Sequence, residues 1–185
     1  MEKIEYNEDV FVIEEFLSNQ ECENLISIAE KIGFEEAKVQ VEKGVESLMK
    51  SIRNNERILY KNEQLAFELF EKSKEFLVIE TENGTVLNLN EMFRFYKYNQ
   101  GQRFKMHRDG NYVRNESEIS YYTFMIYLND NYEGGETEFQ NLFSIIPKQG
   151  DLLVFHHPIK HEGKALISGI KYVLRSDVMY KLNEN

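Results

Sequence analysis

The sequence predicts an α+β fold, a jelly roll with N-terminal helices packed on one of its sheets. Amphipathic helical patterns occupy roughly the first 80 residues, and short strand patterns separated by turn residues fill the remainder. A chain of 185 residues with 42% hydrophobic content buries one core. We therefore expect a single domain, with residues 1–90 as a support and 91–185 as the jelly-roll core.

The support is expected to contain a strand and two helices. The strand covers Val10 to Glu14, and Ser18-Asn19-Gln20-Glu21 then has the form of a capping box, with Gly33 as the C-cap. A second helix is expected from about Glu63 to Leu77. Each helix has an apolar stripe that needs a sheet to cover it. The stripes comprise Cys22, Leu25, Ile26, Ala29 and Ile32 in the first helix and Leu65, Ala66, Leu69, Phe70 and Phe76 in the second.

The core is expected to consist of short strands whose two faces differ. The strands are Met92 to Tyr98, Tyr121 to Leu128, Phe143 to Ile146, Asp151 to Phe155 and Ile170 to Tyr180. Side chains alternate between faces along a strand, so three of these strands carry a face suited to lining a polar cup. These faces comprise Arg94, Tyr96 and Tyr98, then Thr123, Met125 and Tyr127, then Lys171, Val173, Arg175, Asp177 and Met179.

Charge and cysteine content limit the partners and the location. The formal net charge is −10, with acid spread along the chain, which excludes nucleic acid and allows a cationic or neutral substrate. Cys22 is the single cysteine, so no intramolecular disulfide forms, and Met1-Glu2-Lys3-Ile4-Glu5 lacks the features of a signal peptide. No apolar run approaches the roughly 18 residues of a membrane span. We expect a cytoplasmic protein; the sequence does not indicate its oligomeric state.

The chemistry is concentrated in His107-Arg108-Asp109 and a distant histidine. Two histidines and one carboxylate form the face that holds non-haem Fe(II) and leaves other coordination positions open. His156, His157 and His161 are the remaining histidines, and we favour His161 because it lies across a turn from the strand ending at Phe155. His157 is then interpreted as a structural group or as one that supports the metal ligands. His-x-Asp alone is a weak motif, and a histidine bonded to Asp109 in a turn is the competing interpretation.

A cation follows the third ligand at a distance that fits the return strand. Lys171 is positioned to receive the far carboxylate of 2-oxoglutarate, whose near carboxylate and ketone would chelate the metal. Arg175 shares its strand face and offers a two-pronged grip on a carboxylate. Its alternatives are an ion pair with Asp177 or a contact with substrate.

The chain resembles the prolyl 4-hydroxylase-like branch of the Fe(II)/2-oxoglutarate dioxygenases. The resemblance runs through most of the chain and rests on these blocks: Phe16 through Cys22, Phe93 through Gln102, His107 with Asp109, Tyr127-Leu128-Asn129, Gly134-Gly135-Glu136-Thr137, Pro147 with Gly150-Asp151, and His161 through Lys171. It implies a double-stranded β-helix, iron held by His107, Asp109 and His161, and 2-oxoglutarate anchored by Lys171. Tyr98 and Thr123 are the implied hydrogen-bonding partners of the same carboxylate.

The resemblance also implies a reaction. Halogenating relatives lack the carboxylate that Asp109 retains, so hydroxylation is expected, with oxidative decarboxylation of 2-oxoglutarate to succinate and CO₂. O₂ is consumed, and ascorbate is a possible support. The protein's part is orientation, electrostatics and exclusion of water.

The substrate is the open question, because a fold and a metal site do not name what enters the cup. A prolyl residue in a peptide or protein is the leading interpretation by resemblance. The alternative is a free amino acid or other small metabolite, gripped by a polar rim loop between Arg108 and Ser120; Arg57 is a further candidate for the entrance. A non-catalytic metal-binding jelly roll is the third possibility, which the anchor residues disfavour.

Overall fold

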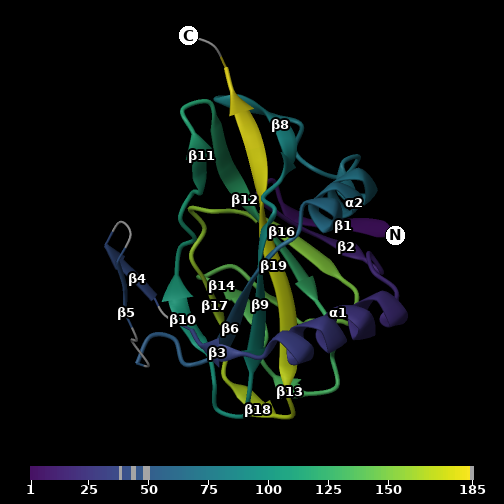
Figure 1. Cartoon of the computed structure of the whole chain (residues 1–185), viewed down its shortest axis with the longest axis vertical. Helices are drawn as coiled ribbons and strands as arrows, with labels where there is room; N and C mark the ends of the chain where they lie inside the picture. The colour runs from purple at the N-terminus through teal and green to yellow at the C-terminus, as the bar shows by residue number, and fades with distance from the viewer. Residues whose placement is uncertain (38, 43–44, 48–50, 184–185) are drawn as a thin grey trace.

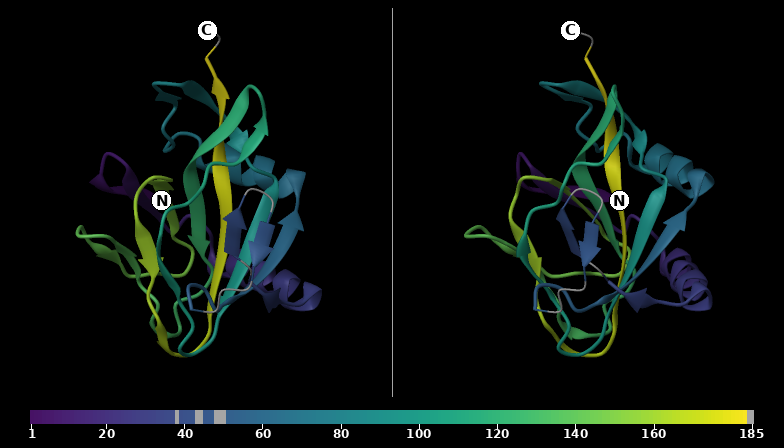
Figure 2. Two further views of the ribbon diagram at one scale, coloured as in Figure 1. Left: turned by 90° about the vertical axis from the view of Figure 1, so that its left-hand side faces the viewer. Right: turned by 60° about the vertical axis from the view of Figure 1, so that its left-hand side comes forward.

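The structure is a computed structural model of the chain, and it describes residues 1–37, 39–42, 45–47 and 51–183. Of residues 39–42 and 45–47 only the backbone is described. Two sheets dominate the described part. They face each other and converge at one end of the molecule (Figures 1 and 2).

The larger sheet has eleven strands. Its main path runs through β1 (Glu2–Asn7), β2 (Val10–Glu14), β16 (Leu152–His156), β12 (Glu118–Tyr127), β19 (Lys171–Leu182), β9 (Met92–Tyr98), β6 (Glu56–Lys61) and β3 (Glu35–Glu36). The side strands are β7 (Glu80–Thr81), β8 (Gly84–Leu89) and β11 (Val113–Asn115). β12 and β19 lie at the centre, and their antiparallel register places Thr123 opposite Asp177 and Met125 opposite Arg175.

The smaller sheet carries four strands and faces the larger one. In order they are β10 (Phe104–His107), β17 (His161–Gly163), β14 (Thr137–Phe139) and β15 (Ser144–Ile145). Two two-stranded sheets stand apart, β13 (Glu133–Gly134) with β18 (Leu166–Ser168), and β4 (Val39–Glu42) with β5 (Val45–Ser47). Two facing sheets of antiparallel strands make the jelly roll that the sequence predicts.

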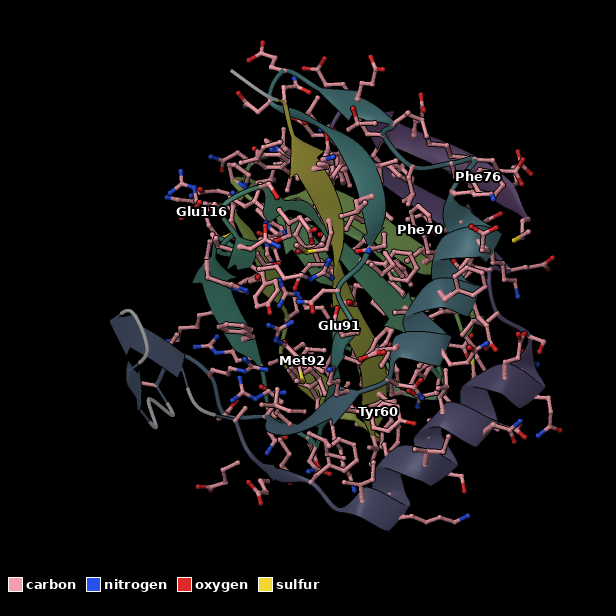
Figure 3. The ribbon with its side chains drawn as sticks, turned by 45° about the horizontal axis from the view of Figure 1, so that its top comes forward. Tyr60, Phe70, Phe76, Glu91, Met92 and Glu116 are labelled. Carbon is pink, nitrogen blue, oxygen red and sulfur yellow. The ribbon has the colours of Figure 1, made fainter. Side chains whose placement is uncertain are left out.

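Two helices lie on the outer side of the larger sheet (Figure 2). α1 (Asn19–Ile32) begins with the predicted capping box, in which Ser18 and Glu21 satisfy each other's backbone amides, and ends at Gly33. α2 (Glu63–Ser73) ends earlier than predicted. Phe70 of α2 and Phe76 beyond its end both pack against the core (Figure 3). The apolar stripe of α2 therefore continues past the end of the helix into a turn. Periodicity alone does not distinguish such a turn from a further stretch of helix.

The two faces of the larger sheet bury different clusters. The outer cluster joins Leu25, Ala29 and Leu69 of the helices to strand residues such as Phe95 and Leu174. The inner cluster lies between the sheets and comprises Val10, Val12, Tyr96, Tyr98, Tyr127, Phe139, Ile145, Leu153, Phe155, Leu166 and Val173. The two-residue alternation predicted for these strands is confirmed, since Tyr96, Tyr98 and Val173 face inward and their sequence neighbours face the helices.

The region predicted as a rim loop contains regular structure. β11 pairs with the start of β12, so Arg108 to Ser120 is in part a hairpin. Arg114 on β11 forms ion pairs with Glu91 and Glu118, both at 2.7 Å, which join this hairpin to the start of β9. Figure 3 shows Glu91 beside β9 and Glu116 at the hairpin end. Polar composition indicated a loop, but cross-strand charge pairing stabilises strands of the same composition.

Candidate metal centre and adjoining cavity

Two neighbouring strands of the smaller sheet bring the three predicted metal ligands together. β10 and β17 are antiparallel, and their register sets His107 opposite His161. Asp109 follows β10 directly. The ligand atoms of these three residues all lie within 4.8 Å of one another. His157, the alternative third histidine, lies outside this group.

Hydrogen bonds fix which ring nitrogens face the centre. Nδ1 of His107 donates to the Lys105 carbonyl at 2.7 Å, and Nδ1 of His161 donates to the Ile159 carbonyl at 3.1 Å. Because Nδ1 carries the proton in each ring, Nε2 retains its lone pair. Nε2 of His107 lies 3.6 Å from Oδ1 of Asp109, and Nε2 of His161 lies 3.8 Å from Oδ2. Burial lowers the pKa of His161 to about 4, so this ring is neutral at pH 7 and able to bind a metal.

Aromatic side chains hold both rings in place. Phe104 stacks on His107 with ring centroids 3.6 Å apart. Phe155 and His161 pack edge to face, with ring centroids 4.4 Å apart. Arg53, which is 5% exposed, lies over the other side of Phe104 and over Tyr96. These contacts restrict rotation of the two rings, which preorganises the centre.

The carboxylate of Asp109 is held by two groups from the larger sheet. Thr123 donates to its Oδ2 at 2.5 Å, and Nη2 of Arg175 lies 3.2 Å from the same oxygen. Burial by itself would raise the pKa of Asp109, but the charge of Arg175 holds it well below its usual range. The group is therefore an anion at neutral pH, as a metal ligand must be.

A cavity extends from this centre to Lys171 at the start of β19. Its lining comes from both sheets and comprises Tyr96, Tyr98, Phe104, His107, Asp109, Thr123, Met125, Thr137, Phe155, His161, Gly163, Lys171, Val173 and Arg175. Apolar walls with a few convergent polar groups are typical of a small-molecule site.

Lys171 is a buried cation without an anionic partner among the described residues. Its Nζ donates to the Gly135 carbonyl at 2.5 Å, and no carboxylate oxygen of the described chain lies within 4.0 Å of it. The rings of Tyr98, Tyr127 and Tyr132 surround it at 5.7, 5.2 and 6.0 Å. Burial lowers the pKa of Lys171 to about 7. A buried cation of this kind is stabilised by a bound anion.

The structure separates the residues predicted to bind the co-substrate. Tyr98 lies at the cavity end that holds Lys171, and burial raises its pKa to about 12, so it is a neutral phenol. Thr123 and Arg175 lie at the opposite end, where both contact Asp109. Thr137, for which the sequence analysis named no role, lines the cavity and bonds to Tyr127 at 2.7 Å. The sequence signal for Thr137 was its place in Gly134-Gly135-Glu136-Thr137, one of the blocks on which the family resemblance rests.

Other candidates have different surroundings. His157 is fully buried, with Nδ1 3.3 Å from Asn111 and Nε2 3.7 Å from Asp177. Arg57 borders a separate surface groove beside the end of α1. The arginine that packs on the cavity wall is Arg53, which lies over Tyr96 and which the sequence analysis did not identify. It belongs to none of the motifs in the sequence.

The donor set fits a divalent iron ion. Two neutral imidazole nitrogens and one carboxylate oxygen, clustered on one side, are the ligands of the facial sites that non-haem Fe(II) occupies. Zn²⁺ accepts the same donor types, but its catalytic sites are tetrahedral, so three protein ligands leave it only one open position. Lys171 lies in the same cavity and has no carboxylate partner among the described residues, so the cavity suits a second ligand that carries a negative charge.

The comparisons with known proteins agree with this geometry. The family model described as 2OG-Fe(II) oxygenase superfamily matches residues 93–176, which include all three candidate metal ligands and Lys171. A probable prolyl 4-hydroxylase 8 of Arabidopsis thaliana is 28% identical over 182 residues, covering 84% of this chain and 60% of the relative. Probable prolyl 4-hydroxylase 11 of the same plant is 31% identical over 149 residues, covering 75% and 49%. The chain thus spans about half of these relatives' length.

Solved structures share the fold. A viral collagen prolyl hydroxylase from Paramecium Bursaria Chlorella virus-1, solved with 2OG, has a TM-score of 0.67 and 24% identity, covering 94% of this chain and 97% of that one. A prolyl hydroxylase from Trichoplax adhaerens, in complex with a hypoxia inducible factor peptide fragment, has a TM-score of 0.69 and 17% identity, covering 92% and 83%. Similarity at this identity establishes the jelly-roll fold of these oxygenases.

Proposed function

We propose that this chain, a prolyl hydroxylase-like member of the 2OG-Fe(II) oxygenase superfamily, hydroxylates a prolyl residue within a polypeptide. His107, Asp109 and His161 would hold Fe(II), and Lys171 would anchor 2-oxoglutarate, with Tyr98 and Thr137 beside it. The bound iron would supply oxidative decarboxylation of 2-oxoglutarate to succinate and CO₂, with one atom of O₂ passing to the substrate as hydroxyl.

One observation carries this proposal. A two-histidine, one-carboxylate cluster and a buried lysine without a carboxylate partner line the same cavity, among the residues that the structure describes. The cluster calls for a metal with open positions, and the lysine calls for an anion. A dicarboxylate with one end on the metal and the other on Lys171 satisfies both requirements.

The remaining groups have roles that follow from their contacts. Phe104 and Phe155 orient the two imidazole rings, and the tyrosines around Lys171 exclude water from its charge. Excluding water strengthens the attraction between the ammonium and a carboxylate. Thr123 and Arg175 hold the Asp109 carboxylate in one orientation.

The polypeptide substrate is supported by the relatives rather than by the cavity. Both plant relatives are described as probable prolyl 4-hydroxylases, and the Trichoplax structure holds a peptide fragment. The rim predicted to grip a free amino acid is largely engaged within the protein. Arg114 pairs with Glu91 and Glu118, and Arg108 donates to the Pro158 carbonyl. These contacts favour the peptide over a zwitterion.

Mass spectrometry tests the proposal. The full chain is incubated with Fe(II), 2-oxoglutarate, O₂ and ascorbate together with proline-containing peptides or, separately, free amino acids. We expect peptides to gain the mass of one oxygen atom, with succinate formed in equal amount. The His161→Ala protein should do neither. Turnover of a free amino acid with no peptide modified would contradict the peptidyl assignment and leave the metal chemistry intact.

A further inference from the structure

Arg175 lies between two carboxylates, at the end of the cavity away from Lys171. Its Nη2 is 3.2 Å from Oδ2 of Asp109 and 3.0 Å from Oδ1 of Asp177, and 3.3 Å from the Thr123 hydroxyl. Arg175 and Lys171 are four residues apart on β19, which separates their α-carbons by about 13 Å. The two cations therefore serve opposite ends of the cavity.

The two oxygens of Asp109 have different environments. Oδ2 accepts a hydrogen bond from Thr123 at 2.5 Å and faces the Arg175 guanidinium. Oδ1 is nearest to Nε2 of His107, at 3.6 Å, beyond hydrogen-bond distance. Oδ2 therefore accepts one hydrogen bond and forms an ion pair with a guanidinium, and Nε2 of His161 lies 3.8 Å from it. Oδ1 has neither a hydrogen-bond donor nor a guanidinium beside it among the described residues, so it is the oxygen with more free lone-pair density for a metal.

Asp177 in turn fixes Arg175. Its Oδ2 accepts from Asn90 at 3.1 Å and from Nη1 of Arg94 at 3.2 Å, which leaves Oδ1 for Arg175. Strands β9, β12 and β19 set these groups side by side, because Arg94 pairs in register with Arg175 and Thr123 with Asp177. Asp177 is 1% exposed, so the guanidinium is held by a buried anion.

We propose that Arg175 is a positioning residue whose ion pair with Oδ2 of Asp109, together with the hydrogen bond from Thr123, directs this carboxylate to coordinate the metal through Oδ1 alone. Single-oxygen coordination leaves three octahedral positions, enough for the two donor atoms of 2-oxoglutarate and one more ligand. A carboxylate free to bind through both oxygens would fill one of them. The inference rests on the proposed metal centre and departs from the predicted role of Arg175 as a co-substrate anchor.

Removing Arg175 separates this role from a purely structural one. Arg175→Met leaves Asp109 and Asp177 as neighbouring anions, which attract a divalent cation, so the metal should still bind. A lost supporting contact of a metal ligand costs about 10–100-fold in activity. We therefore expect kcat to fall by about that factor, with KM for 2-oxoglutarate within about threefold of the wild-type value.

Co(II) in place of Fe(II) gives a readout that needs no substrate. Wild-type, Arg175→Met and Arg175→Lys proteins are titrated with Co(II), and the visible absorption of the bound ion and the Kd of 2-oxoglutarate are measured. Arg175→Met should bind Co(II) with an altered spectrum, because the carboxylate coordination changes. Arg175→Lys keeps a positive charge but has a shorter side chain without the planar guanidinium, so its spectrum should be intermediate. Lys97→Met, which removes a cation from the outer face of β9, should match wild type.

Several outcomes would overturn the inference. A wild-type Co(II) spectrum and kcat in Arg175→Met would show that Arg175 does not position Asp109. A loss of 2-oxoglutarate affinity as large as that of Lys171→Met would make Arg175 an anchor. If Arg175→Met fails to fold, a wild-type spectrum and kcat in Arg175→Lys would equally exclude the role. A wild-type protein that binds Co(II) and 2-oxoglutarate but modifies no peptide would refute the proposed substrate without affecting the spectral result.

Discussion

At the scale of single residues, the most consequential feature is the isolation of Lys171. It lies in the cavity wall with a carbonyl and three aromatic rings as its described neighbours. A cation that is buried without an anion costs free energy, which a ligand carboxylate recovers on binding. Affinity for the co-substrate is therefore expected to depend on this one side chain.

Lys171→Met should weaken 2-oxoglutarate binding by on the order of 100-fold or more, because it removes one partner of a buried ion pair. Isothermal titration of the Co(II)-loaded protein measures the change. Lys164→Met is the matched control, since Lys164 pairs with Glu138 and Glu162 on the outside of the smaller sheet. Equal affinities in wild type and Lys171→Met would exclude the anchor.

The affinity should also depend on pH. Lys171 has a pKa of about 7 in the ligand-free protein, and only its protonated form attracts a carboxylate. As pH rises above 7, the protonated fraction falls about tenfold per unit, so the apparent Kd for 2-oxoglutarate should rise at the same rate. Below pH 7 this dependence should flatten. The Lys171→Met protein should lack it, and a wild-type Kd that stays constant from pH 7 to 9 would contradict the assignment.

At the scale of elements, the helices support the sheet and supply no cavity residue among those described. Cys22 and Ala29 of α1 and Ala66 of α2 join the outer cluster, on the opposite face from the metal centre. The candidate metal ligands instead lie on β10 and β17, two short strands of the smaller sheet, and directly after β10. Stability and activity should accordingly respond to different substitutions.

Ser18→Ala tests this separation. It removes the capping box of α1, in which Ser18 and Glu21 satisfy each other's amides, and should lower the free energy of unfolding by about 1 kcal/mol. Denaturant unfolding measures this change, and Ser18→Asp, which keeps an acceptor at the cap, should recover most of it. The Kd of 2-oxoglutarate should remain unchanged in both. A weakened Kd in Ser18→Ala would show that α1 influences the cavity.

At the scale of the whole molecule, two of the four histidines are buried among the described residues. Burial lowers the pKa of both His157 and His161 to about 4, compared with 6.5 for an exposed histidine. Among the described residues, no helix has the length and apolar character that crossing a membrane requires. Cys22, the single cysteine, is buried within the outer cluster.

The two buried histidines predict an acid-sensitive fold. Between pH 6.5 and about 4 the unfolded chain binds more protons at these positions than the folded chain, so metal-free stability should decrease as pH falls through this range. Each histidine contributes up to a few kcal/mol. Urea unfolding at several pH values measures the slope. His157→Gln should reduce this slope, whereas His156→Gln, at the half-exposed neighbouring position, should not. Equal slopes in the wild-type protein and both variants would refute the explanation.

The sequence by itself determined the motifs that supply the candidate metal ligands and the alternation that places Lys171, Tyr98 and Thr123 on inward faces. Local patterns carry this information because capping boxes and two-residue periods depend on near neighbours. Tertiary structure alone decided what these residues contact. Arg175 and Lys171 share a strand face, yet one meets Asp109 and Asp177 and the other meets no carboxylate among the described residues. Asp177 lies on β19 itself, but Asp109 comes from the turn after β10 and Thr123 from β12, and the register that aligns them arises only when the sheets assemble.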